Sequence, residues 1–370
     1  MHRDEKQPWE TYKKRELAGL SPILLRLGYV LEEKQPHLGG ERHLTRPLSG
    51  GRKLVLLGNR TNDKRRVVIK TSSEKAGIAE IEHEHMCRRM LEDISFAYQT
   101  FLSPEELLFV REGVYAILIT EFIEQEQTFL ERPLKEQFTL ALTAFKAQEG
   151  AHATTYDHAN TIRNTFGEMT ASGYYTKIQQ YTQDIAKLLL DRKELYSPLD
   201  KTLDDAVVFL RDQQTTLAQY GGFLTHWDFT PQNFRIANHN IYLLDHSSLR
   251  FGNKYEGWAR FINFMTLHNP PLEQALVEYV RLNRTAEEFL ALKLMRAYRL
   301  VELIRYYATW LSGTEGDLHE LARTRVLFWS EVLQRVLTNT NVPLAIIETY
   351  KNKRDVLRSP DEKERQKGLH

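Results

Sequence analysis

The sequence predicts an α+β protein with two lobes: a small lobe built on antiparallel strands and a larger, mainly helical lobe. Short runs of β-branched and aliphatic residues, separated by glycine, asparagine and aspartate, occupy residues 42–72 and 106–123. After residue 124, apolar residues recur mainly at helical intervals. The length of 370 residues is sufficient for two hydrophobic cores.

The chain divides into four predicted segments. Residues 1–40 form an N-terminal helical extension, in which residues 1–35 have the pattern of an amphipathic helix. The β-rich lobe occupies residues 41–123, and the helical lobe occupies residues 124–345. Residues 346–370 carry many alternating charges and few apolar residues, which predicts a frayed helix and a flexible tail.

The β-rich lobe begins with three strand candidates, "RHLTRPL" (42–48), "KLVLLGN" (53–59) and "RRVVIKTS" (65–72). The segments "SGG" and "TND" between them are typical of turns, so we expect antiparallel strands with tight connections. Two further candidates are "ELLFVRE" and "YAILITEFI" (115–123). Because the last is almost wholly apolar, we place it at the centre of the sheet.

Helical periodicity marks one segment in the first lobe and most of the second lobe. The predicted helices are 76–94, 134–150, 168–193, 200–219, 272–282, 285–312 and 315–339. Between residues 219 and 272 a loop and a short hairpin interrupt the helices.

Composition and charge argue against several binding partners and cellular locations. The formal net charge is +1, so no global charge favours nucleic acid or a membrane surface. We find no apolar run long enough to span a bilayer, and the charged N-terminus lacks the apolar core of a secretory signal. Cys87 is the single cysteine, so an internal disulfide is impossible and we expect a cytoplasmic protein.

The stretch "THWDFTPQNFRIANHNIYLLDHSS" places His226, Asp228, Asn233 and Asp245 around two short strands. If "FRIAN" and "NIYLLD" form a hairpin that turns near residues 239–240, Asn233 and Asp245 come close together. An amide oxygen and a carboxylate, completed by water and phosphate, are ligands that suit Mg²⁺. Asp228 lies on the preceding loop, where it could accept a proton from an attacking hydroxyl.

Simpler explanations stand beside these assignments. Asp and Asn are common in turns and caps without any further role. The segment "HEHMC" also suggests a metal site, but residues two apart on a helix do not share a face, so we do not expect zinc there. No G-x-S-x-G, H-E-x-x-H or Walker lysine pattern occurs in the sequence.

The segment "HWDFTPQN…IYLLD" resembles the catalytic and metal-binding segment of the aminoglycoside phosphotransferase family, which belongs to the protein-kinase-like superfamily. The order of the elements over residues 40–340 also resembles that bilobal fold. The resemblance implies that Asp228 is the catalytic base or the carboxylate that orients the substrate. It implies that Asn233 and Asp245 bind Mg²⁺, and that His226 fixes the catalytic loop without carrying a proton.

The same resemblance implies a nucleotide site in the first lobe. Lys70 stands on the third strand candidate, where a kinase-like lysine would bind the α- and β-phosphates of ATP. Glu84 is the helix glutamate expected to orient it, with Glu80 and Glu82 as competing choices. A lysine at a strand end in solvent, and a glutamate on a solvated helical face, are the simpler alternatives.

Two further segments complete the expected nucleotide site. Ser49, Gly50 and Gly51 lie between the first two strand candidates, where backbone N–H groups can cover phosphates. The alternative for this segment is a plain hairpin turn. The segment "LITEFIE" resembles a kinase hinge, in which the carbonyl of Glu121 and the N–H of Ile123 would bind adenine.

Three positions depart from the family pattern. Glycine usually follows the loop histidine, whereas this chain has Trp227. An aromatic and then an acidic residue usually follow the last aspartate, whereas "HSS" follows Asp245. The family also tends to carry a later aspartate, where this chain offers Glu256 or Gly257. These differences leave the substrate class open.

The resemblance implies an ATP- and Mg²⁺-dependent phosphotransferase that acts on a hydroxyl group of a small molecule. The acceptor could be an aminosugar, a sugar, an amino alcohol, a choline-like alcohol or a macrolide, bound by residues 150–220 and by helices after residue 255. The tyrosines, arginines and Glu302 of residues 296–310 could line this pocket, although helix packing with a polar outer face is the simpler explanation for most of them. The sequences typical of protein kinases are absent. The alternative is a nucleotide-binding pseudokinase-like regulatory module without catalytic activity.

Overall fold

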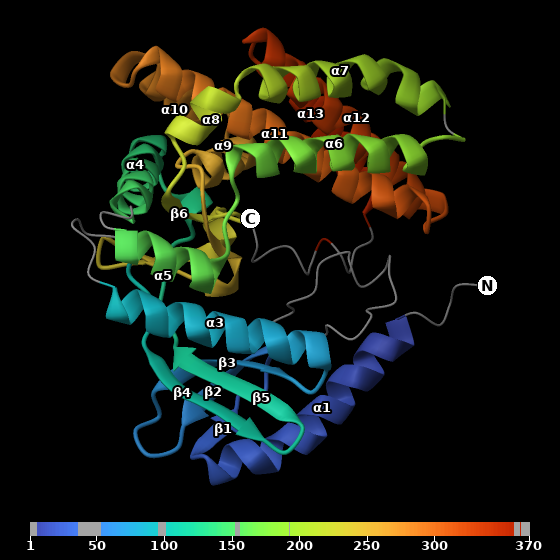
Figure 1. Ribbon diagram of the computed structural model, residues 1–370. Coiled ribbons are helices and arrows are strands. Elements are labelled where there is room, and N and C mark those ends of the chain that lie inside the picture. Colours follow the sequence, from blue (N-terminus) through green and yellow to red (C-terminus); the bar gives the residue numbers. More distant parts are fainter. Residues whose placement is uncertain are drawn as a thin grey trace.

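The computed structural model describes residues 6–35, 53–94, 101–151, 156–191, 193–358 and 363. Figure 1 shows two lobes, a sheet flanked by helices and a larger set of helices above it. The strand candidate 42–48 and the residues Ser49, Gly50 and Gly51 lie outside the described ranges. No helix within these ranges combines the length and the apolar character that a membrane span requires.

The N-lobe is an antiparallel sheet with the strand order β1-β2-β3-β5-β4. The strands are β1 (Tyr29–Leu31), β2 (Leu54–Arg60), β3 (Arg66–Ser72), β4 (Glu106–Glu112) and β5 (Tyr115–Glu121). Six of the seven residues of β5 are buried, as its apolar sequence predicts, but β3 is the middle strand and β5 lies between β3 and the edge strand β4.

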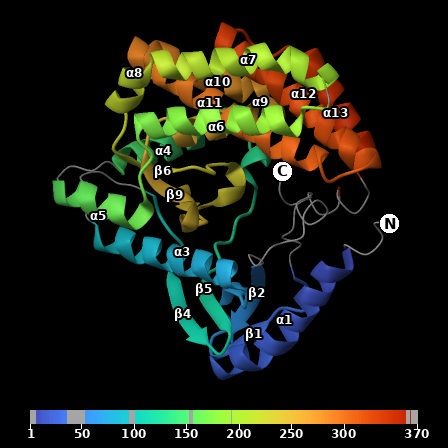
Figure 2. The same cartoon turned by 45° about the vertical axis from the view of Figure 1, so that its right-hand side comes forward.

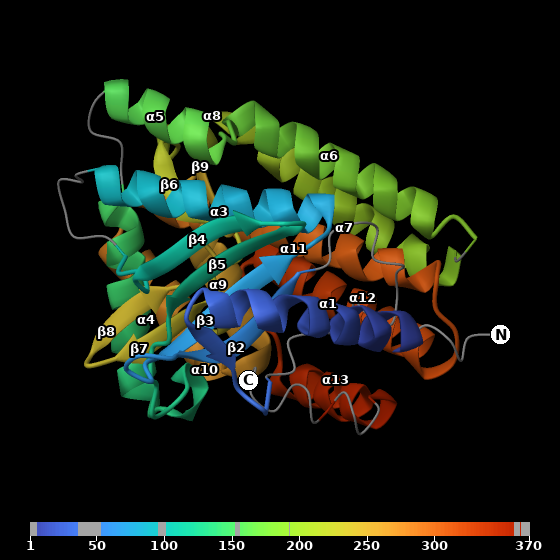
Figure 3. The same ribbon diagram turned by 90° about the horizontal axis from the view of Figure 1, so that it is seen from below.

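The two faces of the sheet pack against different helices because side chains alternate along each strand. On one face Ile69, Ile117 and Ile119 form a core with Leu20 and Leu24 of α1 (Lys6–Arg26). On the other face Ala116 and Leu118 pack against Ile81 of α3 (Lys75–Asp93), which matches the predicted helix 76–94. Figures 2 and 3 show α1 and α3 on opposite sides of the sheet.

The prediction of a helix over residues 1–35 is wrong at its C-terminal end. α1 ends at Arg26, the chain turns at Gly28, and residues 29–31 form the edge strand β1, which pairs with β2. Gly28 has a φ of +85°, a left-handed conformation that glycine adopts without steric strain. Its carbonyl accepts a hydrogen bond from the Thr61 N–H at 2.8 Å, which fixes the turn on the sheet.

The C-lobe is mainly helical, as predicted, and α11 lies at its centre in contact with α6, α9 and α12. The helices are α4 (Leu134–Gly150), α5 (Tyr156–Phe166), α6 (Ala171–Leu188), α7 (Lys193–Asp212), α8 (Gln214–Gln219), α9 (Glu256–His268), α10 (Pro270–Asn283), α11 (Ala286–Leu311), α12 (Gly316–Thr338) and α13 (Leu344–Leu357). α13 is a continuous helix packed on α12 through the buried side chains of Ile347 and Tyr350, in a segment for which we expected fraying.

Sequence analysis missed the helices α5 and α9. α9 has eleven buried residues among thirteen, and its polar residues Glu256 and Asn263 are buried with the apolar ones. α5 is short and mostly polar. Both helices lie next to the strands that carry the candidate site, with α9 packed against β6 (Phe223–His226) and α5 against β9 (Leu249–Gly252).

Two small ribbons interrupt the helices. The predicted hairpin is present as β7 (Phe234–Ala237) and β8 (Asn240–Leu243). Its turn residues are Asn238 and His239, both with positive φ, one position earlier than predicted. β6 pairs with β9 in a second ribbon that the sequence did not reveal, because each of its strands has only four residues.

Candidate active site

The β7–β8 hairpin brings Asn233 and Asp245 together, as the sequence predicts. Phe234 pairs with Leu243, and the Leu244 N–H donates to the carbonyl oxygen of Asn233 at 2.8 Å. Asn233 ends the short helix η2 (Pro231–Asn233) just before β7, and Asp245 follows β8. The chain therefore carries both residues to the same end of one ribbon.

Asp228 lies beside Asn233 on the loop after β6. The amide nitrogen of Asn233 donates to the Asp228 carbonyl at 2.8 Å and to Asp228 Oδ2 at 3.0 Å. The other carboxylate oxygen, Oδ1, accepts a hydrogen bond at 3.0 Å from the Nε of Arg260. Burial opposes ionisation of Asp228, but the positive charges of Arg260 and Arg299 hold its pKa below the usual range. Asp228 is therefore an ionised, partly exposed carboxylate that two neighbours hold in place.

Asp245 has a left-handed backbone with a φ of 53°, which is uncommon outside glycine and asparagine and concentrates at functional sites. Its carboxylate oxygens accept hydrogen bonds from the hydroxyls of Ser247 at 2.9 Å and Ser248 at 3.0 Å. Burial opposes ionisation, but Lys70 at 3.6 Å and Lys53 at 4.0 Å hold the pKa of Asp245 well below its usual range. The "HSS" segment thus supports an ionised carboxylate.

Lys70 and Glu84 are in direct contact. The Nζ of Lys70 lies 2.8 and 2.6 Å from the two carboxylate oxygens of Glu84, whose side chain is 1% exposed. Arg88, one turn later on α3, donates to the same carboxylate at 3.1 Å. Burial raises the pKa of Glu84, but Lys70 and Arg88 outweigh this and lower it. The simpler alternative of a solvated glutamate is therefore wrong.

The competing glutamates have other partners. Glu80 pairs with Lys53 at the start of β2, and Glu82 lies 3.4 Å from Arg111 on β4. Neither contacts Lys70 among the contacts of the described residues. Of the three glutamates that the sequence left open, Glu84 is the partner of Lys70.

His226 is completely buried and holds the loop that follows Asp245. Its Nε2 lies 3.1 Å from the Leu244 carbonyl and 3.0 Å from the Asp245 carbonyl. Burial lowers the pKa of His226, so the ring is neutral and Nε2–H donates to both carbonyls. Its contacts suit a residue that fixes the loop.

The donor set at the hairpin fits Mg²⁺. The amide nitrogen of Asn233 is engaged by Asp228, which leaves its oxygen as the atom able to ligate a cation, next to the ionised Asp245. Within the described part of the chain, no three His, Cys, Asp or Glu side chains cluster closely enough to hold a metal. Two protein oxygens suit Mg²⁺ that shares its remaining positions with water and phosphate.

The proposed hinge residues lie at the junction of the lobes. β5 ends at Glu121, whose carboxylate pairs with Arg65 at 2.7 Å, and Ile123 follows in the connector. The side chain of Gln125 then accepts a hydrogen bond from the Ile236 N–H on β7 at 3.0 Å. The connector therefore runs beside the hairpin, and contact of Glu121 and Ile123 with adenine stays a prediction.

Two residues of this site were missed by sequence analysis. Arg260 lies on the unpredicted helix α9 and pairs with Asp228, and Lys53 at the start of β2 adds a second cation near Asp245. The signal for Arg260 was available, because it is the one charged residue in the apolar run 257–267. Lys53 carries no comparable signal, since lysine at a strand end is ordinary.

Glu256 and Gly257 both have structural roles. Glu256 is fully buried, pairs with Arg250 and accepts a hydrogen bond from the Tyr174 hydroxyl at 2.8 Å. The Gly257 N–H donates to the Thr225 hydroxyl at 3.1 Å, and the side chain of Gln148 fills the space that a side chain at position 257 would need. These contacts fix α9 against β6, just before the loop that carries Asp228.

Trp227 lies beside Asp228 with 38% of its surface exposed. The guanidinium of Arg299 on α11 lies 5.8 Å from the centre of its ring. Arg299 in turn pairs with Glu302, to which the Tyr181 hydroxyl donates at 3.3 Å. The segment 296–310, which the sequence suggested for the acceptor, therefore reaches the loop of Asp228 through Arg299.

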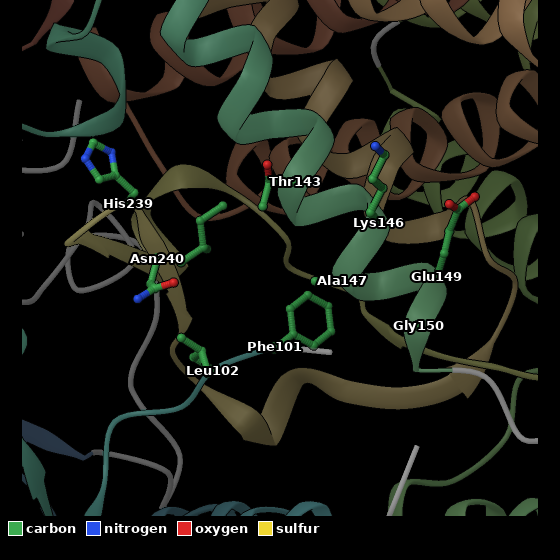
Figure 4. Close-up of a pocket in the computed structure, with 10 residues that line it drawn as sticks. Phe101, Leu102, Thr143, Lys146, Ala147, Glu149, Gly150, His239 and Asn240 are labelled. Atoms are coloured by element: carbon green, nitrogen blue, oxygen red, sulfur yellow. The ribbon is translucent and has the colours of Figure 1, made fainter. Parts of the chain in front are cut away.

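A separate cavity of about 600 Å³ lies between α4 and the tip of the β7–β8 hairpin (Figure 4). Its lining includes Phe101, Thr143, Lys146 and His239. None of the predicted site residues lines this cavity. It is also distinct from the region between residues 150–220 and the helices after 255, where we expected the acceptor.

Comparison with known proteins supports the fold. No family model and no curated protein sequence matches the chain, but many solved structures do. Macrolide 2′-phosphotransferase type I is similar, with a TM-score of 0.54, 14% identity and coverage of 84% of this chain and 97% of that one. Choline kinase from Cryptosporidium parvum has a TM-score of 0.52, 12% identity and coverage of 86% and 92%.

A third similar structure is a mutant of the aminoglycoside phosphotransferase APH(4)-Ia in a ternary complex with AMP-PNP and hygromycin B. Its TM-score is 0.52, with 14% identity and coverage of 80% of this chain and 94% of that one. All three structures are of small-molecule phosphotransferases, and the alignments span both lobes. The predicted fold class is confirmed: this chain has the bilobal, protein-kinase-like fold of the aminoglycoside phosphotransferases.

Proposed function

We propose that this protein is an ATP- and Mg²⁺-dependent phosphotransferase that acts on a hydroxyl group of a small molecule. One observation carries the proposal: Lys70 of the N-lobe faces Asp245 of the C-lobe at 3.6 Å, while Asp228 and Asn233 are hydrogen bonded beside the same ribbon. A cation, a metal-binding pair and an accessible carboxylate are the groups that phosphoryl transfer from ATP requires.

In the proposed reaction the oxygen of the acceptor hydroxyl attacks the γ-phosphorus of ATP. A new P–O bond forms, the bond between the γ-phosphorus and the β–γ bridging oxygen breaks, and ADP leaves with that electron pair. The hydroxyl proton passes through Asp228 to solvent. Asp228 contributes mainly by orienting the hydroxyl, because the loose transition state requires little removal of the proton in advance.

The other groups would bind and neutralise the nucleotide. Lys70, held by Glu84, would contact the α- and β-phosphates, and Ser49, Gly50 and Gly51 would cover them. Adenine would bind at the connector through the backbone of Glu121 and Ile123. Asn233 and Asp245 would hold Mg²⁺, which when bound neutralises charge on the β- and γ-phosphates.

The acceptor would bind in the C-lobe beside Asp228 and Trp227. The similar structures are of enzymes that carry macrolide, aminoglycoside or choline in their names or complexes, and we infer an acceptor of that size: an aminosugar, a sugar, an amino alcohol or a related compound. An exposed indole next to the carboxylate offers a flat apolar surface for such a molecule.

The test is a screen of acceptor-stimulated ADP release with Mg²⁺ and ATP, against a panel of hydroxylated metabolites and antibiotics. Asp228→Asn serves as the inactive comparison, and Asp93→Asn, an exposed carboxylate at the end of α3, serves as the matched control. We expect at least one acceptor to stimulate the wild type and Asp93→Asn but not Asp228→Asn. Nucleotide binding without stimulation by any acceptor would favour the pseudokinase-like module instead.

A further inference from the structure

We propose that Arg260 is a positioning residue of the transfer reaction, holding the Asp228 carboxylate in the orientation that receives the acceptor hydroxyl; this inference rests on the proposed function. The Nε of Arg260 donates to Asp228 Oδ1 at 3.0 Å, and its Nη2 lies 3.0 Å from the same oxygen. A guanidinium with two nitrogens on one oxygen restricts the carboxylate more tightly than a single donor does.

The position of Arg260 is set by the aromatic core directly beneath it. Phe229 follows Asp228, Phe261 follows Arg260, and the centres of these two rings lie 6.0 Å apart. Both rings also contact Phe145, at 6.4 and 5.5 Å. Phe229 and Phe261, which neighbour Asp228 and Arg260 in the sequence, are packed together. The distance from Arg260 to Asp228 is therefore set by core packing rather than by a flexible surface contact.

Each carboxylate oxygen of Asp228 accepts hydrogen bonds from a different residue. Oδ1 is bound by Arg260, and Oδ2 accepts from the amide of Asn233. Without Arg260 the side chain would be held only by Asn233, the residue expected to ligate Mg²⁺. Arg260 therefore helps to orient the Asp228 carboxylate, so that Asn233 can bind the metal without being the only residue that orients Asp228.

Stabilisation of the loop alone does not account for this contact. The side chains of Arg260 and Asp228 are 22% and 39% exposed, and ion pairs of such exposure contribute little to stability. The loop is already held by His226, whose ring bonds to two carbonyls, and by the buried Phe229. What Arg260 adds is contact with the one carboxylate that the proposed reaction uses.

The contact of Arg260 with Asp228 is also specific within the molecule. The charged groups that face Asp228 are Arg260, Arg299 and, when protonated, His226. Arg299 is already paired with Glu302, and His226 is neutral. In the described part of the chain Arg260 makes no other ion pair, so its charge is directed at Asp228 alone.

The kinetic test compares Arg260→Ala, Arg260→Lys and the control Arg89→Ala, an exposed arginine on α3, with the wild type, using an acceptor found in the screen. We expect Arg260→Ala to lower kcat about 10²-fold, the cost of a misplaced reacting group, with the KM for ATP unchanged. Added guanidinium should restore part of the loss and urea should not, and Arg260→Lys should retain more activity. A loss of less than threefold in kcat for Arg260→Ala overturns the inference.

A second measurement separates this inference from the proposed function. In a crystal structure of Arg260→Ala without ligand, we expect the Asp228 carboxylate to rotate about its remaining contact with Asn233, so that Oδ1 leaves its position while Lys70, Glu84 and Asp245 stay in place. An unmoved Asp228 overturns the positioning role, whether or not any acceptor has been found. If the wild type transfers phosphate to no acceptor, the proposed function fails, and the crystal structure alone decides whether Arg260 orients the carboxylate.

Discussion

Asp245 combines a left-handed backbone with an ionised carboxylate that two serine hydroxyls and two lysines surround. Strain in a non-glycine backbone concentrates at functional sites, and the two lysines and Ser247 favour the charged form of this carboxylate. An ionised carboxylate at this position is suited to bind a divalent cation together with nucleotide phosphates.

Replacing Asp245 by Asn should therefore remove the metal-binding charge while keeping the shape of the side chain. We expect turnover to fall by at least about 10³-fold, because metal ions supply several kcal/mol of charge stabilisation in such transfers. The dependence of ATP binding on Mg²⁺ should also disappear, which titration of ATP with and without the metal would measure. Retention of Mg²⁺-dependent binding in this variant would show that the metal lies elsewhere.

The buried Glu256 leads to a prediction about how the stability of the protein depends on pH. It is fully buried with Arg250, and although burial raises its pKa, Arg250 and Arg299 lower the pKa below the ordinary value of 4.5. A carboxyl whose pKa is lower in the folded state stabilises the protein above about pH 4.5, and this contribution is lost as the pH falls through the folded-state value.

We expect Glu256→Gln to lose about 3 kcal/mol of unfolding free energy at pH 7, since it leaves Arg250 buried without its partner. The difference from the wild type should narrow as the pH falls below 4.5, because the wild-type carboxyl is then protonated in the unfolded chain, while in the folded protein it stays ionised down to a lower pH. Urea unfolding at pH 7 and at pH 4 measures both values. An equal difference at the two pH values would mean that Glu256 is not ionised in the folded protein.

At the scale of the element, the turn from α1 into β1 depends on one residue. Gly28 has a φ of +85°, and its carbonyl bonds to Thr61 across the edge of the sheet. Gly28→Val should lower the unfolding free energy by about 1 kcal/mol or more, and Gly28→Asn should lower it less, because asparagine tolerates left-handed conformations. Denaturant midpoints of the two variants test this order, and equal losses would contradict it.

Most elements with a clear period could be predicted from sequence, and those without one could not. β5 and α3 show an apolar run and an amphipathic pattern, so both were predicted, and the β7–β8 hairpin follows from its turn residues. α9 was missed although Glu256, Arg260 and Asn263 recur at helical intervals, and Arg260 was missed with it. β1 was missed because a single glycine, rather than the apolar pattern, separates it from α1.

The contacts of the candidate site fall into the same two groups, those that could be predicted from the sequence and those that could not. Contacts between Lys70 and Glu84, and between Asn233 and Asp228, join residues that family-like spacing identifies in the sequence. The contacts of Arg260 and Lys53 depend on side chains that meet only after the lobes and α9 are assembled. Spacing along the chain does not contain that information.

At the scale of the whole molecule, the site exists because the two lobes meet along several specific contacts. Lys70 approaches Asp245, Ser103 lies 2.7 Å from the ring of His246, and Gln125 binds Ile236 on the hairpin. These contacts surround the ribbon that carries Asn233 and Asp245. The fold thereby sets the cation of one lobe against the carboxylates of the other.

The central proposal is that Mg²⁺–ATP binds at the junction of the lobes and that Asp228 orients the acceptor hydroxyl. Asp228→Asn should separate nucleotide binding from phosphoryl transfer. Calorimetric titration with Mg²⁺–ATP, together with acceptor-dependent ADP release, measures both in the same variant. We predict unchanged nucleotide affinity and a loss of about 10²- to 10⁴-fold in turnover. Full turnover in Asp228→Asn, or the absence of Mg²⁺–ATP binding in the wild type, would contradict the account.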